Sequence, residues 1–220
     1  MNQKIRLRFL AAAAVLAAFA LFTLAVCTVD VQPIGPEGSP VGFAKVNGAF
    51  HALTGVHWAL YTLTDWLGLV PVAVGLGFAG LGLKQWLCRK SLAKVDRSLF
   101  VLAGYYVVVL AAYLLFEKLA VNYRPVTVEG RLEASYPSST TLLVLCVMPA
   151  AMLQLRGRIR NRAWRGLVLI SFGAFTAFMV AGRLVSGVHW LTDILGGGLL
   201  SAGLMLLYDA AVRAAEKQKR

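Results

Sequence analysis

The residues best suited to chemistry lie close together near the end of the chain: Arg183, His189 and Asp193. His189 and Asp193 are four residues apart, so on a helix they share one face, where the carboxylate can accept a hydrogen bond from one ring nitrogen. That bond would fix the imidazole tautomer and leave the other nitrogen free to act as a nucleophile or proton carrier. A structural contact at a helix end explains this pair equally well. The nearby Arg183 favours a chemical role for the pair, because a guanidinium offers two parallel donors to a phosphate.

A second group of residues suited to phosphate lies further upstream. Arg124 precedes a proline, which fixes the local backbone, and Lys118 is nearby. Ser138 and Ser139 belong to the segment 137–141, which opens an apolar run. Hydroxyls and unpaired amides therefore meet at the positive end of a helix dipole, an arrangement that binds anions. Plain N-capping by Ser138 is the alternative interpretation of this segment.

The composition indicates that membrane helices position these residues. The chain has 220 residues, of which 59% are hydrophobic and 15% charged, and its mean hydropathy is +0.70. Soluble domains hold roughly 45–50% apolar residues. A span needs about 20 apolar residues, so this length fits six spans and short loops. We therefore predict one all-α membrane domain over residues 1–220, a bundle of six transmembrane helices.

The apolar runs define the expected spans. Residues 30–49 hold three prolines and predict an irregular loop. Residues 49–68 mix aromatic, histidine and acidic residues with apolar ones, which suits a helix at the membrane interface or packed on its neighbours. The aromatic residues of this segment can anchor the interface or gate lipid entry. The spans are expected at 9–29, 67–83, 99–116, 141–155, 167–185 and 194–212.

The distribution of basic residues predicts the orientation. The net charge of +12 would suggest nucleic acid for a soluble protein, but the basic residues cluster between apolar runs. Of the 22 lysines and arginines, 17 fall in 4–8, 84–97, 156–165 and 213–220. The remaining five are Lys45, Lys118, Arg124, Arg131 and Arg183. By the positive-inside rule both termini are cytoplasmic, and the loops at 30–66, 117–138 and 184–192 face outward. We expect no nucleic-acid partner.

Taken together, three segments resemble the signature of the type 2 phosphatidic acid phosphatase family, from about residue 99 onward. That signature has a lysine, six residues and Arg-Pro; then Pro-Ser-Gly-His; then Ser-Arg, five residues, His, three residues and Asp. The third element matches as Arg183, His189 and Asp193, with Gly182 in place of serine. Five residues rather than six separate Lys118 from the arginine.

The resemblance implies roles for the matched residues. His189 would attack phosphorus to give a phosphohistidine, and Asp193 would orient it. The phosphoryl oxygens would be bound by residues of all three segments: Lys118, Arg124, Ser138, Ser139 and Arg183. The matched region, 99–213, would form a phosphatase-like core, and the scheme needs no metal or cofactor.

Thr140 stands where the family has the histidine that protonates the leaving group and later activates water. A threonine hydroxyl is a poor general acid, and loss of such a group costs roughly 100-fold to 10,000-fold in rate. Three explanations remain open: a substrate that needs little acid help, another group such as His51 or His57 in that role, or an inactive protein. The first favours lipid diphosphates, because a phosphate ester leaves more easily than an alkoxide.

The predicted function is therefore hydrolysis of a lipid phosphate or prenyl diphosphate on the outer face of the plasma membrane. Two alternatives use the same site. One is transfer of the phosphoryl group to another lipid. The other is a non-catalytic protein that binds or transports lipid phosphates.

Overall fold

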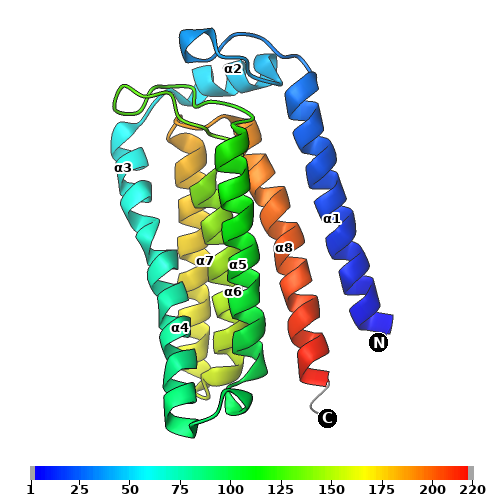
Figure 1. Ribbon diagram of the computed structural model, residues 1–220. Helices are drawn as coiled ribbons and strands as arrows, with labels where there is room; N and C mark the ends of the chain where they lie inside the picture. The colour runs from blue at the N-terminus through cyan, green and yellow to red at the C-terminus, as the bar shows by residue number, and fades with distance from the viewer. Residues whose placement is uncertain (1–2, 218–220) are drawn as a thin grey trace.

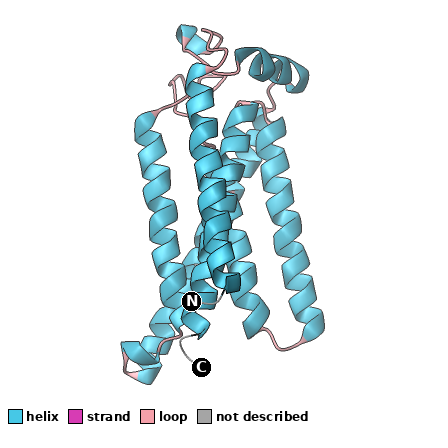
Figure 2. Cartoon of the chain, turned by 90° about the vertical axis from the view of Figure 1, so that its right-hand side faces the viewer, coloured by secondary structure: helices cyan, strands magenta, loops and turns pink. Residues whose placement is uncertain are grey.

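Helices and their connections make up the structure, a computed structural model that describes residues 3–217. No strand is present within that range, as Figure 2 also shows. Two single helical turns, Pro36–Gly38 and Leu92–Lys94, lie in the connections. The α-helices are α1 (Gln3–Thr28), α2 (Ala44–Thr54), α3 (Trp58–Leu67), α4 (Leu69–Arg89), α5 (Arg97–Leu119), α6 (Ser139–Arg158), α7 (Arg162–Val185) and α8 (Leu191–Lys217).

Six helical segments of the described chain are long and apolar enough to cross a membrane. They are α1, the α3–α4 pair as one segment (Trp58–Arg89), α5, α6, α7 and α8. The predicted all-α bundle of six membrane-spanning helices is therefore confirmed. The observed helices extend past the predicted apolar runs, because polar and basic residues at their ends continue the helical turns where a membrane would give way to water.

Both ends of the described chain lie at the same end of the bundle (Figure 1). The helix α2 and the loops that join α5 to α6 and α7 to α8 gather at the opposite end, which we call the loop end. The loops that gather at the loop end are those predicted to face outward from the distribution of basic residues. Lys219 and Arg220, counted with the basic side, lie outside the described residues, and the cytoplasmic position of the termini stays a prediction.

The second span differs from its prediction. Helical structure begins at Trp58 rather than near residue 67, and Gly68 alone separates α3 from α4. The segment 49–68, predicted as a helix at the interface or packed on its neighbours, divides between α2 and α3, and α3 is packed on its neighbours. The reason is that α3 packs against α7, where Thr64 is fully buried close to Gly182. Polar residues are tolerated in a span when they face a neighbouring helix.

The helices α6 and α8 are the two most buried spans, and each follows a loop that holds predicted site residues. In their most apolar stretches, 56% of α6 and 50% of α8 is buried, against 17% for α1 and for α7. Small residues permit this close packing: a Cβ on Gly197 would lie only 3.2 Å from Thr141. Because α6 and α8 both begin at the loop end, the segments that precede them are brought together there.

A close backbone approach at Gly187 fixes the loop between α7 and α8. Gly187 has a φ of 70°, and a Cβ there would stand 1.8 Å from the Gly55 carbonyl oxygen. Nearby, the His57 amide donates a hydrogen bond to the Ser186 carbonyl at 2.9 Å. The connection before α3 is therefore tied to the loop before α8.

Replacing Gly187 with alanine should destabilise the protein, because the side chain would meet backbone and require a left-handed conformation. We expect a loss of about 1–3 kcal/mol in the free energy of unfolding, measured by denaturation in detergent. Gly198→Ala is the matched control, since no atom beyond the adjacent backbone of its own helix lies within 4 Å of that Cβ position and alanine favours helix. Equal stability of the two variants would contradict the close approach.

Candidate active site

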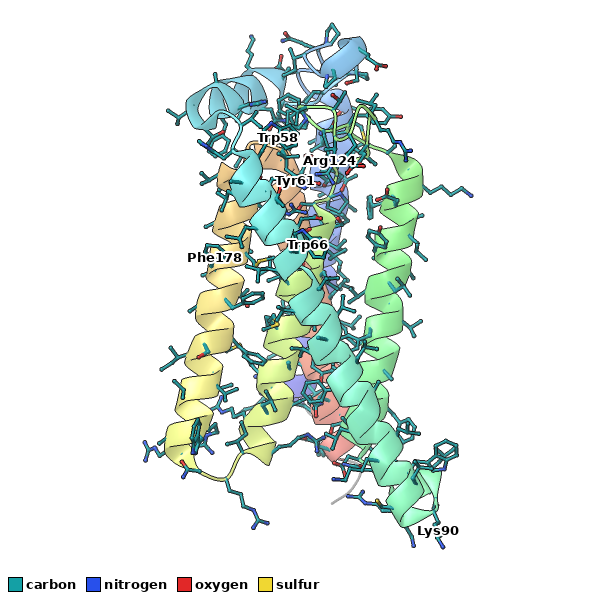
Figure 3. All side chains as sticks on the ribbon, turned by 90° about the vertical axis from the view of Figure 1, so that its left-hand side faces the viewer. Trp58, Tyr61, Trp66, Lys90, Arg124 and Phe178 are labelled. Atoms are coloured by element: carbon teal, nitrogen blue, oxygen red, sulfur yellow. The ribbon has the colours of Figure 1, made fainter. Side chains whose placement is uncertain are left out.

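Arg124, Arg183 and His189, from three separate segments, meet at the loop end of the bundle. Arg124 follows α5, Arg183 lies in the last turn of α7 and His189 precedes α8. Nη1 of Arg124 lies 3.3 Å from Nε2 of His189. The guanidinium carbons of Arg124 and Arg183 lie 5.7 Å and 4.9 Å from the centre of the Tyr61 ring. Figure 3 shows Tyr61 of α3 beside Arg124.

His189 and Asp193 are neighbours, but the predicted hydrogen bond between them is wrong for this structure. Nδ1 of His189 is 3.7 Å from Oδ2 of Asp193. The carboxylate instead accepts hydrogen bonds from the Trp190 amide at 2.8 Å and from Nδ2 of Asn122 at 3.5 Å. Nδ1 is buried and makes no hydrogen bond of standard geometry with the described residues, and the Ser135 backbone is a hydrogen-bonding group close to the ring. Catalytic hydrogen bonds are often long before substrate binds, and a small shift would close this one.

The contact with Arg124 indicates the tautomer of His189. A guanidinium has only donors, so Nε2 must accept and the ring proton is left to Nδ1, facing Asp193. Burial lowers the pKa of His189 well below 6.5, the charges of Arg124 and Arg183 lower that pKa further, and a hydrogen bond with the Ser135 backbone opposes the shift without cancelling it. The imidazole is therefore neutral near pH 7, with its Nε2 lone pair directed toward the arginines.

Ser138 has the structural role that the sequence left open. Its hydroxyl oxygen accepts a hydrogen bond from the Thr141 amide at 3.5 Å and so caps α6. Its amide donates to the Asp193 carbonyl at 3.1 Å. This bond ties the start of α6 to the first turn of α8, while the Ser138 hydroxyl keeps its proton for another acceptor.

Two residues predicted to bind phosphate are not brought to the arginines and His189. Ser139 lines a small cleft with Tyr113 and Glu117 of α5. Lys118 is exposed on the last turn of α5 and has no hydrogen bond or ion pair with any described residue. The spacing between Lys118 and Arg124 is one residue shorter than in the family signature. This accounts for the position of Lys118, because a shift of one position turns a helical side chain by about 100°.

Thr140 contacts the site through Arg183. Its hydroxyl oxygen accepts a hydrogen bond from Nη2 of Arg183 at 2.5 Å, and its methyl group lies near Gly68.

The two other histidines of the chain are placed elsewhere. The His51 ring packs edge-on against Trp190 at 5.6 Å, and Nε2 of His57 bonds the Thr54 carbonyl at 2.9 Å.

Sequence reasoning missed four residues of this site: Asn122, Glu133, Tyr61 and Asp65. Glu133 pairs with Nε of Arg124 at 3.0 Å. Asp65 pairs with Nη2 of Arg183 at 2.9 Å. A usable signal existed for Asp65, since an acidic residue within an apolar span is costly and usually functional.

Fold and site together define a multi-pass helical membrane protein with a buried cluster of arginine and histidine side chains. Residues 69–216 match the PAP2 superfamily, and the chain belongs to that superfamily, as predicted. No curated protein matches the sequence significantly.

One solved structure shares the fold: the crystal structure of the first transmembrane PAP2 type phosphatidylglycerolphosphate phosphatase from Bacillus subtilis. The match covers 95% of this chain and 97% of that chain, with a TM-score of 0.56 and 19% sequence identity.

The lowered pKa of His189 can be measured directly. A variant with His51→Gln and His57→Gln keeps His189 as the single histidine of the three, so the NMR signal of isotope-labelled histidine reports that ring alone. We expect the ring to stay neutral at pH 6.5 and to titrate well below it, because burial and the two arginines oppose a positive charge. Titration at or above 6.5 would contradict the described environment.

Proposed function

We propose that this protein is a membrane lipid phosphatase that transfers the terminal phosphoryl group of a lipid diphosphate to His189 and then to water. One observation carries the proposal. A neutral, buried imidazole contacts one buried guanidinium, and a second lies close by on the Tyr61 ring. Membership of the PAP2 superfamily and the fold shared with a transmembrane phosphatase support phosphatase activity.

In the first step, Nε2 of His189 attacks phosphorus and the bond to the bridging oxygen breaks. The leaving lipid monophosphate takes the bonding electron pair. Arg124 and Arg183 bind the phosphoryl oxygens, and the free proton of the Ser138 hydroxyl supplies a further donor. As positive charge develops on the ring, Asp193 stabilises the Nδ1 proton. Fixed charges positioned in this way stabilise the transition state.

Thr140 supports the choice of a diphosphate. It contacts Arg183 but cannot donate a proton efficiently to the leaving oxygen. A phosphate ester is a weakly basic leaving group and needs little protonation, whereas the alkoxide released from a simple monoester needs much. Lipid diphosphates are therefore the preferred substrate class over monoesters such as phosphatidic acid.

The surface of α3 supports entry of the substrate from the lipid phase. Trp58 and Trp66 are 47% and 68% exposed, and they flank Tyr61 on the same helix (Figure 3). Exposed aromatic residues at this depth suit the membrane interface. Because the loop end carries few basic residues, we place the site on the outer face of the plasma membrane.

The second candidate is a non-catalytic protein that binds or transports lipid phosphates, which the loss of the histidine at Thr140 favours. Such a protein would bind lipid diphosphate without releasing phosphate. Phosphoryl transfer to another lipid would show as a phosphorylated acceptor in place of free phosphate.

The deciding experiment measures phosphate release by the purified protein from a prenyl diphosphate and from phosphatidic acid. We expect faster release from the diphosphate, and a loss of at least roughly 1,000-fold in the His189→Ala variant. Release that survives His189→Ala would refute the covalent mechanism. Faster release from phosphatidic acid would refute the preferred substrate class.

A further inference from the structure

A carboxylate from another helix stands beside the position where the acid–base group is missing. Nη2 of Arg183 donates both to Oδ1 of Asp65 at 2.9 Å and to Oγ1 of Thr140 at 2.5 Å. Because both oxygens bond the same nitrogen, the Asp65 carboxylate is a close neighbour of the Thr140 side chain. Asp65 can therefore reach the space that Thr140 leaves without a titratable group.

The packing of α3 on α7 brings Asp65 to this place. Thr64, the residue before it, is buried, and a Cβ on Gly182 would stand 2.7 Å from its methyl carbon. Gly182 thus permits an approach that a larger residue would oppose. It precedes Arg183 directly, so the same contact sets Asp65 against the guanidinium.

Exposure at the protein surface distinguishes Asp65 from the buried groups of the site. Its side chain is 57% exposed, while that of Arg183 is 1% exposed. Asp193 is fully buried and bonded to the Trp190 amide. Asp65 therefore combines contact with Arg183 and a side chain that is open at the protein surface, and a residue that activates water requires such an open side.

His189 and Asp65 contact different arginines of the site. In-line displacement requires water to attack phosphorus from the side opposite the His189 nitrogen. Arg124 contacts His189, whereas Arg183 contacts Asp65, and the Tyr61 ring touches both guanidiniums. A phosphoryl group bound between the arginines would have His189 toward one and Asp65 toward the other.

We propose that Asp65 is the general base of the second step, in which water releases phosphate from His189; this rests on the proposed function. The Asp65 carboxylate accepts a proton as the water oxygen bonds to phosphorus. The bond between phosphorus and Nε2 breaks, and its electron pair returns to the imidazole. The products are inorganic phosphate, neutral His189 and a protonated Asp65 that then loses its proton to solvent.

The test separates the two steps with a prenyl diphosphate that carries a labelled terminal phosphoryl group. In Asp65→Asn, we expect a rapid burst of prenyl monophosphate equal to the enzyme present, followed by slow turnover. Steady-state phosphate release should fall by roughly 100-fold or more, and labelled phosphohistidine should accumulate. Asp65→Glu, which keeps the carboxylate, should recover part of the turnover.

Glu133→Gln is the matched control, because Glu133 is the carboxylate paired with the other arginine. It should not accumulate phosphohistidine, since it faces Arg124 rather than Arg183. Melting temperatures of all variants in detergent identify any loss of fold.

Three results would overturn the proposal. Unchanged turnover in Asp65→Asn would make the carboxylate dispensable. Tighter binding of inorganic phosphate with turnover intact would make Asp65 a mere counter-ion of Arg183. Loss of turnover without labelled enzyme, in both Asp65→Asn and Asp65→Glu, would place its effect before phosphoryl transfer. A wild type that turns over with no labelled intermediate, and an active His189→Ala, would instead refute the covalent function itself.

Discussion

The arrangement of the site depends on two positively charged guanidinium groups that are buried close together. Arg124 and Arg183 are at most 8% exposed, and the Tyr61 ring contacts both. Buried positive charges are costly unless they are paired. Each has a carboxylate partner, Glu133 or Asp65, that remains partly exposed. In the proposed mechanism a phosphoryl group accepts charge-assisted hydrogen bonds from guanidinium donors that these partners leave unoccupied.

The same two charges determine the state of His189. They oppose protonation of the ring and add to the effect of burial. A histidine that is neutral before substrate arrives has a free lone pair, and it becomes easier to charge once a phosphate neutralises the arginines. In the proposed mechanism, phosphate binding by the arginines and nucleophilic attack by His189 are thus coupled through electrostatics.

Much of this arrangement follows from the sequence. Arg183, His189 and Asp193 could be identified because they flank the start of one helix at fixed spacing, and six apolar runs predicted the bundle. Asp65 and Tyr61 could not be found in this way, because they reach the site through the packing of α3 on α7, which depends on the contact between Thr64 and Gly182. Lys118 shows the opposite case: it is near Arg124 in sequence, but the spacing is one residue short and its side chain turns away from the site.

We propose that Arg124, Arg183 and His189 enclose a space for one phosphoryl group. An experimental structure with orthovanadate, which mimics phosphorus during transfer, would reveal that space. We expect vanadium bonded to Nε2 of His189, with its oxygens within hydrogen-bond distance of both guanidinium groups. Vanadate bound elsewhere, or bound to the arginines with His189 turned away from it, would rule out this arrangement.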